Sequence, residues 1–258
     1  MKIEVYTRSM NHQLYRLSQS TILLPYNRKR QLFTSADGFF YDNIMNSKAD
    51  IIINIDEDAF ITDNKILKNL LEYVIDNDYI NCGVPDGGVI PIRKHNPLVT
   101  NPFFNIFNVS KIKEKFNLKD ILENYSTHKV EFEKFAPNHL LKHIYEYDYY
   151  EPYYSFFVWL GVNFKTLYLD ANEHSDGIST VVKDHLGQHF LYHSWYSRLY
   201  GKDKFHTLRI NKLVNEALGN DMTNELIKGQ NFFCKLYEDF GQKYYYPIKY
   251  RLERGKGY

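Results

Sequence analysis

The sequence predicts an α/β protein, built as a three-layer α/β/α sandwich with a mostly parallel central sheet and a helical C-terminal extension. The main observation is the segment Ile51–Ile55, where four isoleucines form a nearly continuous apolar run. Such a run is typical of a strand that is buried on both faces of a parallel sheet. The segments on either side alternate between strand-like and helix-like patterns, which indicates strands connected by helices.

Length and composition limit the class of protein. With 258 residues, of which 44% are hydrophobic, the chain can form one α/β domain with a small addition. The net charge of +1 gives no support for nucleic-acid binding. Cys82 and Cys234 lie far apart, so neither a disulfide framework nor a zinc site is indicated. The chain shows no signal-peptide pattern and no run of ~20 apolar residues, so we expect a cytoplasmic protein.

The first part of the chain contains candidates for a nucleotide site. In nucleotide-binding sheets the end of the first strand commonly meets the ligand, so Thr7 and Arg8 could contact a nucleotide; an ordinary loop is the alternative. The elements predicted here are strands at Ile3–Thr7 and Ser20–Pro25, a basic turn at Asn27–Arg30, and a helix over Asp37–Asn46.

Three acidic residues, Asp56, Glu57 and Asp58, follow the isoleucine run directly. Ligands of open α/β sheets bind beyond the carboxyl ends of the strands, so these side chains are placed to meet a ligand. Because side chains alternate along an extended chain, we expect Asp56 and Asp58 to face the ligand and Glu57 to point away. Two carboxylates in this position favour a hard cation such as Mg²⁺ or Mn²⁺.

Other interpretations of the acidic segment remain open. The simplest is a solvated strand end, with Thr62 or Asp63 capping the next helix. An EF-hand does not fit, because Phe60 and Ile61 stand where an oxygen ligand and the turn glycine are required. A phosphatase with an aspartyl nucleophile would need a threonine at the position of Phe60.

The middle of the chain offers one further polar candidate. Pro85–Gly88 is predicted to be a turn or a sugar-binding loop, in which Asp86 either contacts a substrate hydroxyl or begins an Asx-turn. The other elements predicted here are an amphipathic helix over 66–75, strands at Tyr79–Val84 and Asn101–Val109, a strand and loop over Val89–Pro97, and a helix beginning near Pro137.

Two later stretches carry candidate site residues. Glu151 precedes Pro152, which suits the first turn of a helix, and a turn at Asn163 and a strand at Lys165–Leu169 follow. An acid at this place could serve as a general base or could simply stabilise the helix N-terminus. Farther on, His185 and His189 are spaced as on one helix face, so a zinc site is a rival interpretation, although the glutamate of His-Glu-x-x-His is missing.

The C-terminal part is predicted to be helical from Lys204 onward. Partial apolar stripes run through Leu208–Leu218 and Leu226–Phe240. The segment Gln242–Arg251 is both basic and aromatic, so it could lie on a membrane interface; a plain C-terminal extension is the alternative.

Taken in order, these segments resemble a GT-A-fold glycosyltransferase of the family 2-like kind. The resemblance covers about residues 1–200 and includes the Asp-x-Asp motif of Asp56 and Asp58. It implies that these acids and His193 bind Mn²⁺ or Mg²⁺, and that Arg198, with Lys202, steadies the leaving diphosphate. It also implies that Asp42 and Asp56 lie near the donor and that Glu151 is the general base. With these we group Thr7 and Arg8 as further candidates for donor contacts, and Asp86 as a second candidate catalytic residue that contacts a hydroxyl. Pro152 departs from the family pattern, in which a second acid stands there.

The resemblance also implies a function and a division of the chain. The expected reaction moves a sugar from a nucleotide-diphosphate donor, most simply a UDP-sugar, to a hydroxyl of a glycan or lipid-linked acceptor. Inversion is expected if Glu151 acts as the base, and a retaining front-side reaction is the alternative if no base is positioned. The expected parts are a catalytic domain at 1–203, divided into a nucleotide-sugar half at 1–110 and an acceptor half at 111–203, and an extension at 204–258. The alternatives are a degenerate domain that binds nucleotide or glycan without turnover, and a metal-dependent hydrolase that uses Asp56 and Asp58.

Overall fold

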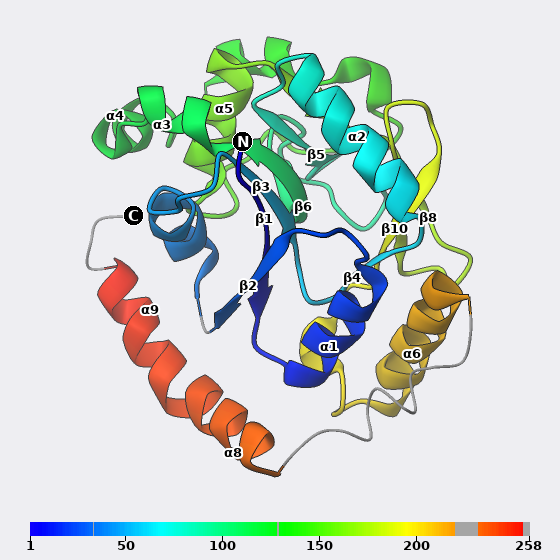
Figure 1. Cartoon of the computed structure of the whole chain (residues 1–258). Coiled ribbons are helices and arrows are strands. Elements are labelled where there is room, and N and C mark those ends of the chain that lie inside the picture. Colours follow the sequence, from blue (N-terminus) through cyan, green and yellow to red (C-terminus); the bar gives the residue numbers. More distant parts are fainter. Residues whose placement is uncertain (33, 128, 220–231, 255–258) are drawn as a thin grey trace.

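The computed structural model describes residues 1–32, 34–127, 129–219 and 232–254, and it confirms the α/β class (Figure 1). Six strands form the main sheet, in the order β2-β1-β3-β6-β5-β7, and four form a second sheet, in the order β4-β10-β9-β8. In the main sheet β6 runs antiparallel to β3 and β5, whereas the other neighbouring pairs are parallel. The central sheet is therefore mostly parallel, as the sequence predicts.

Strands and helices alternate early in the chain, and later a run of helices is followed by a run of strands. Their bounds are β1 (Ile3–Ser9), α1 (His12–Thr21), β2 (Asn27–Leu32), η1 (Gly38–Asn43), β3 (Ile51–Ile55), β4 (Ala59–Ile61), α2 (Asn64–Asp76), β5 (Asn81–Pro85), β6 (Thr100–Asn108), α3 (Val109–Lys115), α4 (Leu118–Asn124), η2 (Val130–Phe135), η3 (Asn138–Leu140), α5 (Tyr154–Asn163), β7 (Thr166–Tyr168), β8 (Ala171–Glu173), β9 (Thr180–Lys183), β10 (His189–His193), η4 (Ser197–Leu199), α6 (Lys204–Leu218), α8 (Phe232–Phe240), η5 (Gly241–Tyr245) and α9 (Tyr246–Arg254).

The isoleucine-rich strand β3 lies inside the main sheet, between β1 and β6. Ile51, Ile53 and Ile55 pack into one core together with α2, whereas Ile52 packs into a second core with η1 and α5. This division follows from the alternation of side chains along a strand. A strand that is apolar on both faces needs a covering layer on each side, and this gives the three layers.

The second core is mainly aromatic and surrounds Phe40 of η1. The ring of Phe40 lies 4.8 Å from that of Phe157 and 5.7 Å from that of Phe156, measured between centroids. Both partners belong to α5, in which every residue from Tyr154 to Leu160 is buried. A helix that is apolar all round must be covered on all sides, so α5 is an internal helix and holds its first residues firmly.

Two of the predicted N-terminal elements are wrong. Most of the segment predicted as a strand at Ser20–Pro25 belongs to the end of α1 and the turn after it, and the basic turn at Asn27–Arg30 is part of β2. Helix α1 begins early because the side chain of Asn11 accepts hydrogen bonds from the backbone of Gln13 and Leu14. Strand β2 can be polar because it lies at the edge of the sheet.

Other predicted elements have mixed outcomes. The cap at Asp63 is confirmed, since its side chain accepts hydrogen bonds from Lys65 and Ile66. The segment Val89–Pro97 is a loop without the expected strand, and the helix expected near Pro137 is only the single turn η3. His185 lies in a turn and His189 in strand β10, so these two residues do not share a helix face, and the basis for the rival zinc site is lost.

The C-terminal part is helical where the structure describes it. Helix α6 packs on α1 through Ile210, Leu213 and Val214, so it is joined to the body of the protein. Helices α8 and α9, connected by η5, run along the outside of the molecule (Figure 1). The stripe predicted over Leu226–Phe240 falls partly outside the described residues. No helix within the described ranges is long and apolar enough to cross a membrane.

The position of β3 leads to a stability prediction. Ile53 is fully buried, so Ile53→Ala is expected to lower the free energy of unfolding by about 2–5 kcal/mol, because it removes buried methyl groups and leaves a cavity. Ile144 is 81% exposed, so the matched variant Ile144→Ala should change it by less than about 0.5 kcal/mol. Denaturant unfolding of both variants measures the difference, and equal losses would contradict the position assigned to β3.

Candidate active site

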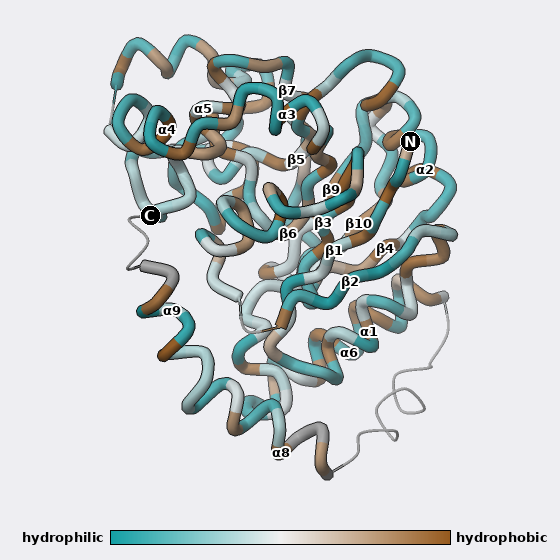
Figure 2. Tube along the Cα trace, turned by 60° about the vertical axis from the view of Figure 1, so that its left-hand side comes forward, coloured by the Kyte–Doolittle hydropathy of each residue, from teal (hydrophilic) through white to brown (hydrophobic). Residues whose placement is uncertain are grey.

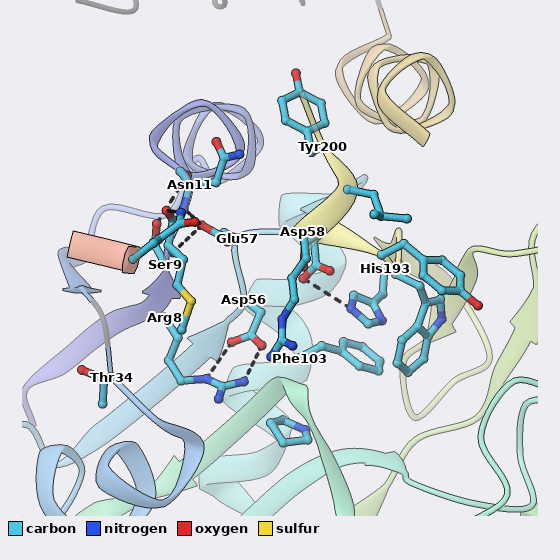
Figure 3. A pocket seen from close by; sticks show the side chains of 18 of the residues that line it. Arg8, Ser9, Asn11, Thr34, Asp56, Glu57, Asp58, Phe103, His193 and Tyr200 are labelled. Atoms are coloured by element: carbon cyan, nitrogen blue, oxygen red, sulfur yellow. Dashed lines mark hydrogen bonds and ion pairs between the residues drawn. The ribbon is translucent and has the colours of Figure 1, made fainter. Parts of the chain in front are cut away.

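A cleft of about 960 Å³ opens at the carboxyl ends of β1 and β3 (Figure 3). Its walls come from the ends of these two strands, the amino end of β6, the residues just before α5, the segment after β10, and one side of α8, η5 and α9. Because β6 is antiparallel, its amino end lies at the same edge as the carboxyl ends of β1 and β3. The cleft thus occupies the place where α/β sheets bind ligands, and its volume suits a small molecule.

Asp56 forms a two-point ion pair with Arg8 at the floor of the cleft. Nη2 of Arg8 lies 2.6 Å from Oδ2 of Asp56, and Nε lies 3.2 Å from Oδ1. Burial opposes the charge on the guanidinium, but the adjacent carboxylate of Asp56 raises the pKa of Arg8 overall. Burial also raises the pKa of Asp56, an effect that Arg8 partly offsets. Each residue therefore neutralises the other where water is scarce.

Asp58 faces His193, with Nε2 of the imidazole 3.4 Å from Oδ1 of the carboxylate. Strand β4 begins directly after Asp58 and pairs with β10, which places His193 opposite Ala59. The imidazole stacks on Phe103 at a centroid distance of 4.1 Å. Burial opposes the charge on Asp58, but His193 and the hydroxyl of Ser197 lower its pKa overall. Asp58 and His193 are thus held together by strand pairing and stacking.

Glu57 points the other way, toward the start of α1 (Figure 3). Its Oε2 accepts hydrogen bonds from the backbone N–H of Met10 at 3.0 Å and of Asn11 at 2.9 Å. Burial nevertheless raises the pKa of Glu57 to about 8, because it destabilises the carboxylate more than these two hydrogen bonds stabilise it. Glu57 therefore ties the end of β3 to the loop after β1.

Glu151 and Arg93 lie together in another part of the cleft. Burial raises the pKa of Glu151, and the charge of Arg93 partly opposes the increase. Arg93 is held by Asp86 through two hydrogen bonds of 2.6 and 2.7 Å. Burial opposes the charge on the Arg93 guanidinium, but the carboxylate of Asp86 raises the pKa of Arg93 overall. This part of the cleft therefore presents one carboxylate and one oriented cation.

Asp86 itself is fully buried and does not line the cleft. Besides Arg93, its carboxylate accepts hydrogen bonds from the side chains of Asn101 and Tyr154. Arg93 and Asn101 both reach the cleft, so Asp86 acts on it through its neighbours. The sequence indicates Asp86 only through the turn that contains it. A predicted turn does not tell whether its acid is buried or exposed.

The other predicted site residues are divided between the cleft and its surroundings. Arg198 and Lys202 line the cleft and are exposed. Thr7 is buried outside it and accepts a hydrogen bond from Gln19. Asp42 lies on η1 and does not belong to the lining. The structure thus brings Arg8, the acids after β3, Glu151, His193 and Arg198 to one cleft.

Several lining residues escape prediction from the sequence. Arg93 and Trp195 reach the cleft from loops that carry no motif. Glu238, Gln242 and Tyr246 reach it from the C-terminal helices, which the sequence marks only as helical and basic. Their separation from the acids by most of the chain hides the contact, because only the tertiary structure brings them near.

The donor atoms in the cleft fit a divalent cation in part. Two ligands bound about 2.1 Å from one ion lie about 3.0–3.4 Å apart, and Asp58 and His193 have this spacing. Asp56 is occupied by Arg8. Across the described ranges, no three His, Cys, Asp or Glu side chains are grouped so as to hold a metal ion by themselves. A cation here would thus need ligands from a substrate, as Mg²⁺ commonly does with phosphates.

Comparison with known proteins gives only distant likenesses. No protein family and no curated protein matches the chain. Among solved structures, A197 from STIV is similar with a TM-score of 0.38 and 9% identity, over 74% of this chain and 94% of that chain. S. aureus TarS 1–349 gives a TM-score of 0.32 and 12% identity, over 52% and 54% of the two chains. Mannosyltransferase PcManGT from Pyrobaculum calidifontis, in complex with GDP-Man and Mn²⁺, gives 0.33 and 9%, over 57% and 55%.

The environment of Glu57 leads to a pH prediction. Its pKa rises from 4.5 to about 8 on folding, so between these values the folded protein binds more protons than the unfolded chain. The free energy of unfolding should therefore fall as pH rises from 5 to 8, relative to Glu57→Gln, by at most about 1.4 kcal/mol per pH unit. Denaturant unfolding of both proteins across this range measures the difference, and a constant difference would contradict the burial of the acid.

Proposed function

We propose that the chain is a metal-dependent glycosyltransferase of the GT-A kind, which moves a sugar from a nucleotide-diphosphate donor to a hydroxyl of a glycan or lipid-linked acceptor. A UDP-sugar is the first donor to test. The observation that carries the proposal is the cleft at the ends of β1 and β3, where Asp58 and His193 converge beside Arg8. Arg198 and Lys202 add positive charge to the same cleft, as a diphosphate requires.

In the proposed complex the cation is held by Asp58 and His193, and its further ligands are oxygens of the donor diphosphate and of Asp56. When bound, the cation would stabilise the negative charge that develops on the leaving diphosphate. Arg198 would make two-point contacts with a phosphate group, and Lys202 would act as a point charge. The side chains of the cleft thus bind and orient the part of the donor that leaves.

Arg8 is proposed to change partners when the donor binds. Without a donor, its guanidinium binds both carboxylate oxygens of Asp56. A phosphate group offers the same two-oxygen geometry and more negative charge, so it can compete for Arg8. Asp56 would then be an uncompensated buried carboxylate, which is unfavourable unless a cation takes the place of Arg8. Donor and cation binding would therefore favour each other at this pair.

Glu151 is proposed as the general base for the acceptor hydroxyl. Its raised pKa makes the carboxylate a better proton acceptor, and it remains open to the cleft. Arg93, fixed by Asp86, would hold the acceptor or steady the charge on Glu151. Attack by the activated hydroxyl opposite the diphosphate would invert the configuration at the sugar. In this proposal Asp86 is a positioning residue.

Two observations favour a second candidate, a domain that binds nucleotide-sugar without turnover. Asp56 is occupied by Arg8, and Pro152 stands beside Glu151 where the family pattern has a second acid. Both features would be expected in a site that has kept binding and lost catalysis. The two candidates differ in turnover and share donor binding, so the following two measurements separate them.

The first measurement is binding of UDP in the presence of Mn²⁺, followed as stabilisation against denaturation. A ligand at about 100 times its dissociation constant stabilises the folded state by about 2.7 kcal/mol. Wild type should show this only when UDP and Mn²⁺ are both present, and Asp58→Asn should lose most of it. Asp76 is exposed at the end of α2, so the control Asp76→Asn should behave as wild type. Equal stabilisation of both variants would refute the cation site.

The second measurement is release of UDP from a UDP-sugar when an acceptor is supplied. Glu151→Gln should lower kcat by about 10²–10⁴-fold and leave UDP binding unchanged, because the amide cannot accept the proton. Glu146 lies five residues earlier and is exposed, so Glu146→Gln should retain the wild-type rate. Turnover that survives in Glu151→Gln would exclude this residue as the base, and wild-type binding without turnover would favour the second candidate.

A further inference from the structure

The C-terminal helical run α8–η5–α9, residues 232–254, has an inverted distribution of polarity. We name this run the strap. Amphipathic helices of globular proteins normally turn their apolar side toward the protein and their polar side toward water. Figure 2 shows hydrophobic and hydrophilic residues interspersed along the strap. The contacts of the strap with the protein are made by polar side chains, whereas many of its large apolar side chains are exposed.

The inner side of the strap is fixed to the body by polar contacts. Nε2 of Gln242 donates to the backbone carbonyl of Met10 at 2.5 Å. Oε1 of Glu238 lies 2.9 Å from Nη2 of Arg30, whose guanidinium also donates to Ser9. Nζ of Lys249 donates to the hydroxyl of Thr34 at 3.0 Å. These contacts attach the strap to the ends of β1 and β2, so its orientation is set by hydrogen bonds and an ion pair.

The outer side carries an apolar stripe of residues spaced by four, all between 50% and 68% exposed. Residues four apart lie on one face of a helix, so the stripe continues along the whole run. Lys243 and Arg251 are exposed in the same segment. The members of the stripe are Leu236, Phe240, Tyr244, Ile248 and Leu252.

An exposed apolar stripe of this length requires a partner, because large contiguous apolar patches are rare on soluble monomers. The strap cannot bury the stripe by turning over, since doing so would break the contacts of Glu238 and Gln242. The partner must therefore offer an apolar surface and approach from outside.

Charge identifies the partner. Residues 232–258 contain six Lys and Arg against three Asp and Glu, a net charge of +3, so the remaining 231 residues carry −2 of the total of +1. A symmetric dimer built on the strap would set one positive strap against another. A bilayer that contains anionic lipids instead offers an apolar interior beneath a negative surface.

We propose that the strap lies in the surface of an anionic lipid bilayer. The apolar stripe would enter the boundary between headgroups and acyl chains, and Lys243 and Arg251 would meet the headgroups. The other side of the strap lines the cleft through Asp239, Gln242 and Tyr246, so the membrane would hold the cleft beside its surface. A lipid-linked acceptor would be within reach there, a consequence that rests on the proposed function.

Co-flotation of the full chain with lipid vesicles tests the proposal. Wild type should float with vesicles of equal parts phosphatidylglycerol and phosphatidylcholine, and it should bind phosphatidylcholine alone at least tenfold more weakly. The double variant Phe240→Ser/Ile248→Ser should bind the mixed vesicles about tenfold or more weakly, because two inserted side chains are lost. Lys243→Gln/Arg251→Gln should weaken binding by about fivefold for each charge.

The matched control removes exposed apolar side chains elsewhere. Leu23 and Leu186 are 75% and 68% exposed on other segments, so Leu23→Ser/Leu186→Ser should bind vesicles as wild type does. Folded wild type that stays unbound from the mixed vesicles would overturn the proposal. A wild-type dimer that Phe240→Ser/Ile248→Ser converts to a monomer would overturn it in favour of a second copy. No donor, acceptor or cation is present, so the result is independent of sugar transfer.

Discussion

The structure around the cleft depends on how three consecutive carboxylates are accommodated at the end of a buried strand. Unpaired charges in such a place would be strongly destabilising. Asp56 is neutralised by Arg8, Asp58 faces His193, and Glu57 accepts two backbone N–H groups and has a raised pKa. The loop after β1 and the end of β10 are therefore fixed by their contacts with these acids.

The same constraint explains why the cleft is suited to a charged ligand. The partners of Asp56 and Asp58 are side chains that a diphosphate or a cation can replace, whereas the partners of Glu57 are backbone groups that remain in place. Little free energy is lost when a charged side chain exchanges its ion-pair partner for another group of similar charge. Along this short segment, the exchangeable contacts of Asp56 and Asp58 thus stand on either side of the fixed contacts of Glu57.

The sequence predicts the features that depend on local pattern. Strand β3 follows from its isoleucines, the start of α2 from the cap at Asp63, and the acids from their place after β3. It fails for α1, because the cap at Asn11 lies in what looks like a polar turn. It cannot show the pairing of β4 with β10 or the approach of Gln242 to Met10, because both join segments far apart in the chain. The prediction that His193 lies at the site rests on the resemblance to GT-A glycosyltransferases and not on a local pattern.

A crystal structure of the protein with Mn²⁺ and UDP tests the central claim most directly. The account predicts an ion bound by Asp58 and His193, with Arg8 turned from Asp56 to the diphosphate and Asp56 turned to the ion. A complex in which UDP occupies the cleft while Arg8 still binds Asp56 and no ion lies between Asp58 and His193 would contradict it.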